Sequence, residues 1–237
     1  NNTLDGCTIR SGGIAIAITG TSAAIPSTNQ VVKNCTILDC NTVGIQTANT
    51  TGLILRNNLI ERPNRTALGA FQGIAMNGGT KNALIEQNRI RNPYAQTPSQ
   101  SANNATGIFV NSTGTLLGET ITVQNNLISD FNSNGVINGI QTASGAVNYL
   151  NIYHNTIVFN NAAANPGVGA DAFGINAQTS CAPGLCNLIN NNVYISRPVG
   201  VASNVCLRFN TGASGSTAVV SNYNNLFLSS NATGNFY

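Results

Sequence analysis

Residues 53–62 read LILRNNLIER, and this stretch decides how the chain folds. Leu55 and Ile60 fit a half-buried strand, but the polar Asn58 stands between them and breaks the alternation of apolar and polar residues. The same interruption recurs along the chain as apolar-x-x-Asn-x-apolar. It reads LDGCTI from Leu4, VKNCTI from Val32, LRNNLI from Leu55, IEQNRI from Ile85, VQNNLI from Val123, IYHNTI from Ile152, INNNVY from Ile189 and, more loosely, NYNNLF from Asn222.

A second motif, Gly-Ile-x-x, alternates strictly with the first. It begins at Gly13, Gly44, Gly73, Gly107, Gly139 and Gly174, and CLRF at Cys206 resembles a seventh copy. Each repeat holds short β-rich segments separated by turn residues, and none shows the period of an amphipathic helix. One such unit cannot bury its apolar face, whereas stacked units form a continuous core. The sequence therefore predicts an all-β fold, a parallel β-helix of about eight coils, as a single domain over residues 1–237.

The central position of the first motif predicts a ladder of buried side chains. Stacked asparagine amides hydrogen-bond from one coil to the next, and asparagine also tolerates the left-handed backbone that a tight bend needs. Cysteine is the small, apolar continuation at the first two positions. The predicted ladder is Cys7, Cys35, Asn58, Asn88, Asn126, Asn155, Asn192 and Asn225.

These two alternating motifs resemble the right-handed parallel β-helix repeats of the pectate-lyase-like superfamily, over essentially the whole chain. The resemblance implies the right-handed fold, while the superfamily holds lyases, hydrolases, epimerases, tailspikes and adhesins. The fold alone therefore does not name an activity. Members that are lyases use clustered carboxylates for Ca²⁺ with a basic residue, and members that are hydrolases use paired carboxylates.

The acidic residues of this chain do not reproduce that set. No two of the seven carboxylates fall in the same column of neighbouring coils. In repeat register, Glu86 lies beside Arg56, Glu61 beside Arg91, and Asp39 near Arg62, an arrangement typical of ion pairs on the outer wall. The single histidine, His154, falls in a column of surface amides. We therefore expect no catalytic, cofactor-binding or metal-binding residues.

Composition limits the kinds of partner and the location that the chain is expected to have. A net charge of +3 with 7% charged residues does not favour nucleic acid, and no apolar run is long enough for a membrane-spanning helix. Six cysteines favour an oxidising, extracellular or cell-surface location. Cys181 and Cys186 are candidates for a disulfide across a short loop. Cys35 and Cys40 are a second candidate pair. Alternatively, Cys7 and Cys35 are free thiols that stack one coil apart.

Long connections leave the same corner of successive coils and gather on one side of the rod. Their aromatic residues Phe71, Tyr94, Phe159 and Phe173 are candidates for stacking on sugar rings, or for covering the sheet. The leading hypothesis is a non-enzymatic extracellular stalk, adhesin segment or filament subunit, either a segment of a longer protein or a subunit that stacks end to end. The alternative is a carbohydrate-active enzyme or glycan-binding module that uses the loop face, with Glu119, Asp130 or Asp171 near its ligand.

Overall fold

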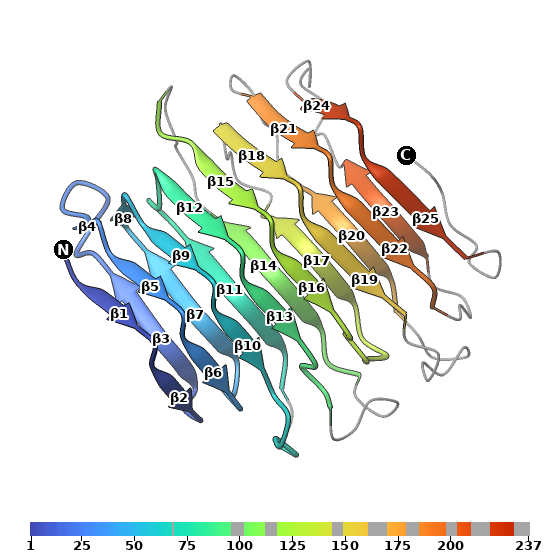
Figure 1. Cartoon of the computed structure of the whole chain (residues 1–237), viewed down its shortest axis with the longest axis horizontal. Helices are drawn as coiled ribbons and strands as arrows, with labels where there is room; N and C mark the ends of the chain where they lie inside the picture. The colour runs from blue at the N-terminus through green and yellow to red at the C-terminus, as the bar shows by residue number, and fades with distance from the viewer. Residues whose placement is uncertain are drawn as a thin grey trace.

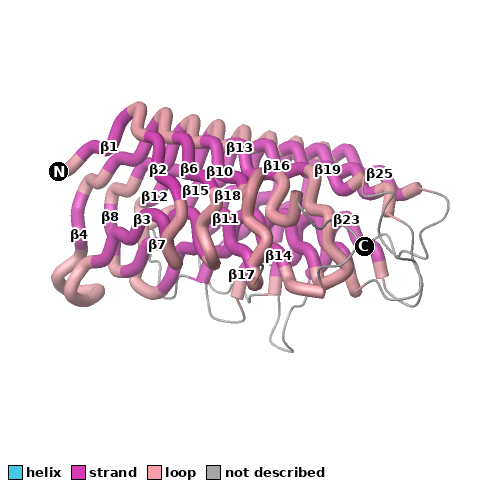
Figure 2. Tube along the Cα trace, turned by 90° about the horizontal axis from the view of Figure 1, so that it is seen from below, coloured by secondary structure: helices cyan, strands magenta, loops and turns pink. Residues whose placement is uncertain are grey.

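The computed structural model describes residues 1–67, 69–95, 102–111, 118–143, 149–160, 170–178, 185–197, 203–209 and 219–229. The chain is a right-handed parallel β-helix, whose coils stack along the long axis from the N-terminus to the C-terminus (Figures 1 and 2). The fold class predicted from the repeats is thereby confirmed. The first seven coils each contribute one strand to each of three parallel sheets, and the eighth contributes to the first two in the described part of the chain, so neighbours in a sheet are one repeat apart in sequence.

The first and second sheets have eight strands each in the described part of the chain. The first sheet consists of β1 (Thr3–Asp5), β5 (Val31–Lys33), β9 (Ile54–Arg56), β12 (Ala83–Glu86), β15 (Ile121–Gln124), β18 (Tyr149–Tyr153), β21 (Leu185–Ile189) and β24 (Val219–Asn222). The second sheet consists of β2 (Thr8–Arg10), β6 (Thr36–Leu38), β10 (Leu59–Glu61), β13 (Arg89–Arg91), β16 (Leu127–Ser129), β19 (Thr156–Phe159), β22 (Asn192–Ile195) and β25 (Asn225–Leu228).

The third sheet carries the Gly-Ile motif and has seven described strands. They are β3 (Ile14–Thr19), β7 (Val43–Ala48), β11 (Phe71–Asn77), β14 (Ala105–Asn111), β17 (Ile137–Thr142), β20 (Ala172–Ala177) and β23 (Asn204–Phe209). A small fourth sheet pairs β4 (Ser27–Thr28) with β8 (Thr50–Thr51).

The core is a set of apolar columns that run along the axis, because residues in register on parallel strands stack directly. In the second sheet one inward column consists of Ile9, Ile37, Ile60, Ile90, Ile128, Ile157, Val193 and Leu226. In the third sheet the isoleucine of the motif points inward, and Ile45, Ile74 and Ile108 are fully buried. The predicted copy at Gly13 was wrong by two residues, because Ile16 pairs with Ile45 and Ile14 is exposed on the outer face. The repeat thus supplies one continuous core rather than separate ones.

The glycines of the Gly-Ile motif from Gly44 on are explained by how closely the second sheet approaches the third. A Cβ atom added at Gly107 would lie 2.6 Å from the backbone oxygen of Gly139 and 2.8 Å from Cγ2 of Ile128. Gly73 has the same environment, with Ile90 at 2.6 Å. A side chain at these positions would push the sheets apart, which close-packed interiors tolerate poorly.

A corner of two residues joins the first sheet to the second in every described coil. The first corner residue has the left-handed backbone, with φ between 53° and 66°, at Gly6, Asn34, Asn57, Gln87, Asn125, His154, Asn190 and Tyr223. The left-handed backbone was predicted at the ladder residue itself, and this was wrong by one position. The first corner residue turns the chain, which leaves the second free to point its side chain inward.

The second corner residue forms the ladder. Asn58 Nδ2 donates to Asn88 Oδ1 of the next coil (2.9 Å) and to the backbone oxygen of Val32 in the previous one (3.0 Å), while the Asn58 backbone N–H also donates to Asn88 Oδ1 (3.1 Å). The same pattern continues through Asn88, Asn126, Asn155, Asn191 and Asn224. Every amide in the ladder interior is therefore satisfied without water, which is what a buried polar group requires.

The last two positions of the ladder differ from the predicted ones. Leu188, not Ile189, is the inward residue of its strand, so Asn191 occupies the ladder position. Asn192 and Asn225 are exposed, and Asn225 Nδ2 donates to Asn192 Oδ1 on the outer surface (3.1 Å). The prediction was wrong by one residue here because two successive apolar residues precede three successive asparagines, which leaves the register open.

Candidate functional site

The outer face of the third sheet is the most promising surface, because loops flank it on both sides. Outward side chains form two columns along the axis. One consists of Ile14, Val43, Gln72, Thr106, Asn138, Phe173 and Val205. The other consists of Ala17, Gln46, Ala75, Phe109, Gln141, Asn176 and Arg208. These columns are richer in amides and rings than a sheet that only faces water.

A hollow of about 420 Å³ lies over β7, β11, β14 and β17, and we call it the amide hollow. Its described lining consists of Thr42, Val43, Ala70, Phe71, Gln72, Asn104, Thr106, Phe109, Val136, Asn138 and Gln141. Asn104 Oδ1 accepts from the backbone N–H of Val136 (3.0 Å), and Thr106 Oγ1 donates to Gln141 Oε1 (3.2 Å). These contacts hold the polar groups in place and leave amide N–H groups, such as those of Gln141, on a partly exposed surface.

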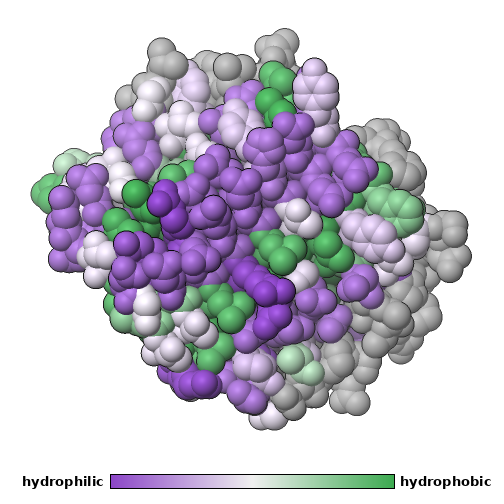
Figure 3. Space-filling model, viewed as in Figure 1, coloured by the Kyte–Doolittle hydropathy of each residue, from purple (hydrophilic) through white to green (hydrophobic). Residues whose placement is uncertain are grey.

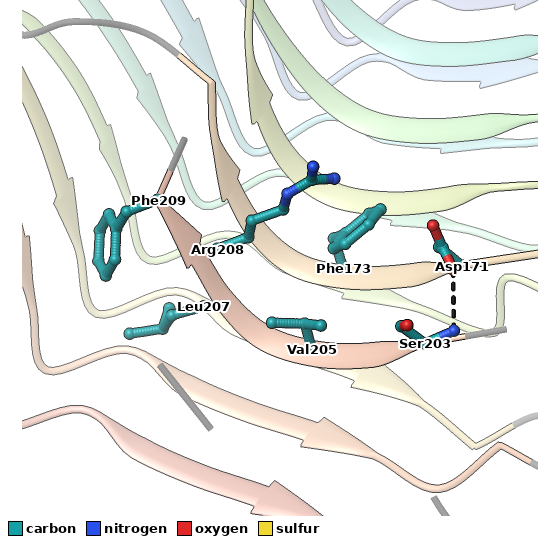
Figure 4. Close-up of a pocket in the computed structure, with 7 residues that line it drawn as sticks. All are labelled: Asp171, Phe173, Ser203, Val205, Leu207, Arg208 and Phe209. Atoms are coloured by element: carbon teal, nitrogen blue, oxygen red, sulfur yellow. Dashed lines mark hydrogen bonds between the residues drawn. The ribbon is translucent and has the colours of Figure 1, made fainter. Parts of the chain in front are cut away.

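A second hollow of about 380 Å³ lies over β20 and β23, and we call it the arginine hollow (Figure 4). Asp171, Phe173, Ser203, Val205, Leu207, Arg208 and Phe209 line it. The Arg208 guanidinium lies 4.9 Å from the centre of the Phe173 ring. Asp171 Oδ1 accepts from the backbone N–H of Ser203 (2.8 Å), on the other side of Phe173.

The two hollows follow one another along the sheet, although the outward side chains between them, Asn138, Asn176 and Phe173, are buried. Asn138 lines the amide hollow, and its Oδ1 accepts from Asn176 Nδ2 on the next strand (2.9 Å). Asn176 in turn pairs in register with Arg208 of the arginine hollow. From β7 to β23 there are five strand intervals of about 4.8 Å, so the face extends over roughly 24 Å. That length suits an extended ligand rather than a small molecule.

Three of the four candidate sugar-stacking rings are inside the protein. Phe71, Tyr94 and Phe159 have at most 1% of their surface exposed. Phe71 and Phe159 pack against Phe131, at centroid distances of 6.2 and 5.4 Å. The structure thus contradicts the prediction of an exposed stacking role for these three. Phe173 faces outward and lines the arginine hollow, but only 4% of its surface is exposed.

Two buried arginines hold the loops between the second and third sheets. Arg62 is fully buried and donates to the backbone oxygens of Asn41, Gly69 and Ala70. Its guanidinium also lies 4.6 Å from the centre of the Phe71 ring. It was expected to pair with Asp39 on the outer wall, and this was wrong, since Asp39 faces Arg10 at 4.0 Å. Burial lowers the pKa of Arg62.

Arg197 has the same role further along the rod. It donates to the backbone oxygens of Ala170 (2.7 Å) and Ser133 (2.6 Å), and the backbone oxygen of Arg197 accepts from Asn204 Nδ2 (3.0 Å). Burial lowers the pKa of Arg197 to about 10, which still leaves the guanidinium charged at neutral pH. A fixed cation on several carbonyl groups anchors a loop beside the candidate site.

The other predicted ion pairs are present on the outer wall. Arg56 pairs with Glu86, and Arg91 Nε lies 2.7 Å from Glu61 Oε2. Glu119, one of the acidic candidates for a ligand site, pairs with Lys81 (2.6 Å). His154 occupies a tight-corner position between the first and second sheets, away from the third-sheet face, with its ring 6.5 Å from that of Tyr153.

Cys7, Cys35, Cys40 and Cys206 are free thiols, which excludes the Cys35–Cys40 disulfide. Cys7 and Cys35 instead occupy successive coils at the ladder position, and the backbone N–H of Cys35 donates to Asn58 Oδ1 (3.0 Å). Burial raises the pKa of the Cys206 thiol to about 11. The predicted Cys181–Cys186 disulfide stays a prediction, since Cys181 lies outside the described residues.

No group of three or more His, Cys, Asp or Glu side chains in the described ranges is arranged to hold a metal ion. The described residues also contain no helix long and apolar enough to cross a membrane. Sequence reasoning missed Phe109, Gln141 and Arg208. Their shared signal is the position directly after the inward isoleucine or leucine of the Gly-Ile motif, which is the outward one in every described copy from Gly44 on.

Comparison with known proteins adds one finding. Residues 1–149 match a family model described as "Right handed beta helix region". No curated protein and no solved structure gives a significant match to the chain.

Proposed function

The chain belongs to the right-handed β-helix family, and on that premise we propose that it is an extracellular β-helical rod that binds a polysaccharide along the outer face of its third sheet. The observation that carries the proposal is the amide hollow, in which the partly exposed Gln72, Asn104 and Gln141 amides lie around the half-buried Phe109 ring. Amides both donate and accept hydrogen bonds, which suits sugar hydroxyl groups. An aromatic ring offers an apolar face for the carbon side of a sugar ring.

The periodicity of the face supports a polymeric ligand. Gln46, Phe109, Gln141 and Arg208 are partly exposed in one outward column, and Phe109 and Gln141 lie in register on successive strands about 4.8 Å apart, so amide and ring groups recur along the axis. A polysaccharide also presents similar groups at regular intervals, and each added sugar can repeat the contacts of the last. The affinity of such a ligand is expected to rise with chain length.

The described linings favour binding over cleavage. Glycoside hydrolysis uses two carboxyl groups that flank the bond. No Asp or Glu is among the described residues of the amide hollow, and Asp171 is the one carboxylate among those of the arginine hollow. The carbohydrate-active enzyme that the sequence left open therefore has less support than a binding module.

The surrounding rod fits a stalk or adhesin segment. Its ladder and ion pairs hold each coil to the next, and the face shown in Figure 3 is largely polar with separate apolar patches. A location outside the cell fits the abundance of uncharged polar residues and the polysaccharide ligand. We propose this location together with the binding function.

A second candidate function, end-to-end assembly, rests on the first coil. Leu4, Ile16 and Ile18 point into the core but are only half-buried, and they line an apolar hollow of about 230 Å³. A further coil, from a second copy or from the same chain where it is longer, would cover them by adding strands to β1 and β3. Electron microscopy at increasing protein concentration tests assembly of copies: fibres support it and uniform short rods contradict it.

The binding proposal is tested on an array of neutral and acidic polysaccharides, followed by calorimetry with oligosaccharides of increasing length. Phe109→Ala is expected to weaken binding of the best ligand at least about tenfold, since covering a Phe side chain contributes about 1.5–3 kcal/mol. Tyr194→Ala is the matched control, because Tyr194 is an exposed ring on the second sheet. Unchanged affinity in Phe109→Ala, or an equal loss in Tyr194→Ala, would contradict the proposed surface.

A further inference from the structure

Most of the acidic residues are paired with cations, which makes the remaining charges informative. Of the seven acidic residues, five form ion pairs with cations. The pairs are Arg10–Asp39, Lys33–Asp5, Arg56–Glu86, Lys81–Glu119 and Arg91–Glu61. The remaining two, Asp130 and Asp171, accept from Ser129 Oγ and from the backbone N–H of Ser203.

The other five cations are all arginines, and four have an evident role or position. Arg62 and Arg197 are buried on backbone carbonyl groups. Arg65 donates to the backbone oxygen of Asp39 (3.1 Å) and to Asn41 Oδ1 (2.8 Å). Arg89 is exposed on the second sheet. Arg208 is left, and among the described lining residues of the two hollows it is the one cation.

Arg208 is positioned without being neutralised. It leaves β23 on the outer face of the third sheet, and its guanidinium lies over the Phe173 ring, 4.9 Å from the centroid (Figure 4). That contact fixes one face of the guanidinium and leaves its N–H donors free of any protein acceptor in the described part of the chain. Val205 and Phe209 make the surroundings apolar, which strengthens the attraction for an anion.

We propose that the arginine hollow is an anion subsite, which binds a carboxylate or sulfate group carried by the polysaccharide. This inference rests on the proposed function and specifies its ligand. A guanidinium presents parallel N–H donors that match two oxygens of either group. Asp171 bounds the hollow beyond Phe173, and its charge disfavours a second anion there while it can accept from a sugar hydroxyl.

The subsite also gives the bound chain a direction. The amide hollow offers uncharged groups over β7 to β17, whereas the arginine hollow adds a cation over β20 and β23. An anionic sugar is therefore held at the C-terminal end of the face, with neutral sugars extending toward the N-terminal coils. A glycan with charge at one end or at spaced positions satisfies both hollows at once.

The test uses one oligosaccharide backbone, chosen as the best neutral binder, in neutral, C6-carboxylate and C6-sulfate forms. Calorimetry at low salt is expected to show an anionic form binding about tenfold more tightly than the neutral one, since charge-assisted hydrogen bonds exceed neutral ones. The stronger of the two anionic arms identifies the group. Arg208→Gln should remove the advantage and leave neutral binding intact, Arg208→Lys should keep part of it, and Arg89→Gln should change nothing.

The outcomes separate this subsite from the binding function. If the neutral form binds and Phe109→Ala abolishes that binding, the proposed function holds. The subsite alone is then overturned if the anionic forms bind no better than the neutral one, or if their advantage survives in Arg208→Gln. Absence of binding by all three forms overturns the proposed function and the subsite with it. An anionic advantage abolished equally by Arg89→Gln would indicate general attraction to the positive chain rather than a site.

Discussion

The chain passes from one sheet to the next in different ways on the two sides of this rod. Between the first and second sheets, each described coil turns in two residues, one with a left-handed backbone and one in the ladder. Between the second and third sheets, the connection ranges from residues 11–13 in the first coil to residues 92–104 in the fourth. There the chain is held by individual side chains, such as Arg62 and Arg197, that do not recur in successive coils.

This contrast teaches where variation is tolerated. The tight corner is coupled along the whole rod, because each ladder amide contacts the coil before and the coil after. The connections between the second and third sheets, which we call the wide corners, are each fixed by contacts local to their own loop. Such a corner can change without disturbing the next coil. The third-sheet face lies beside the wide corners, so a binding surface can vary there while the ladder preserves the fold.

The largest effect is expected at the tight corner. Asn126→Leu removes the acceptor of the Asn88 backbone and side-chain N–H groups and the donors to Ile85 and Asn155. Because each buried polar group left without a partner costs about 1–3 kcal/mol, we expect a loss of about 3–5 kcal/mol in the free energy of unfolding. Denaturant titration followed by circular dichroism measures it.

The matched pair for this experiment is Asn191→Ala and Asn192→Ala. Adjacent in sequence, they differ in that Asn191 is buried in the ladder and Asn192 is exposed. Asn192→Ala is expected to change stability by less than about 0.5 kcal/mol, as a surface substitution does. A larger loss at Asn192 than at Asn191 would show that the ladder register is wrong.

A smaller effect is expected at a wide corner. Arg197→Met keeps much of the buried apolar stem but leaves the carbonyl groups of Ala170 and Ser133 without their donor. Since the substitution also removes a buried charge, we expect a loss of about 1–3 kcal/mol in the free energy of unfolding, with Arg89→Met as the exposed control. A loss as large as that of Asn126→Leu would contradict the local character of this corner.

The smallest effect concerns the exposed outer wall. The Asn34 amide and the Lys33 ammonium hold the pKa of Asp5 below its usual value. The folded state therefore favours the charged carboxylate. The contribution of this carboxylate to the free energy of unfolding is present above the ordinary pKa of Asp, and it is lost as the pH falls through the lowered pKa of Asp5. Asp5→Asn is expected to flatten the stability profile slightly below about pH 4, with no change at pH 7 beyond the lost pairing. An unchanged acid profile would show that this contact contributes nothing.

The sequence predicted the regular side of the molecule well and the irregular side poorly. Two alternating motifs suffice for the solenoid, because register in a parallel stack repeats every coil. The predicted register was wrong at residues 188–192, because neither the apolar residues nor the asparagines there single out one position. The pairing of Leu188 with the previous coil decides it, and this contact is long-range.

The candidate site was predicted only in its location. The loop side was identified, but Phe71 was placed outside although it immediately precedes the outward Gln72 and so points inward. Arg62 was placed on the wall because its position follows the strand, and the loop that folds over it cannot be derived from a repeat. Phe109 and Arg208 were within reach, since both follow the inward residue of a motif that the sequence shows plainly.

The central claim is that one side holds the fold and the other binds a polysaccharide. Hydrogen–deuterium exchange of the intact chain, with and without its best oligosaccharide, tests it most directly. The account predicts added protection in β11, β14 and β17 and in the loops before them, with no change in β10, β13 and β16. Protection confined to the second sheet, or no change anywhere at saturating ligand, would contradict it.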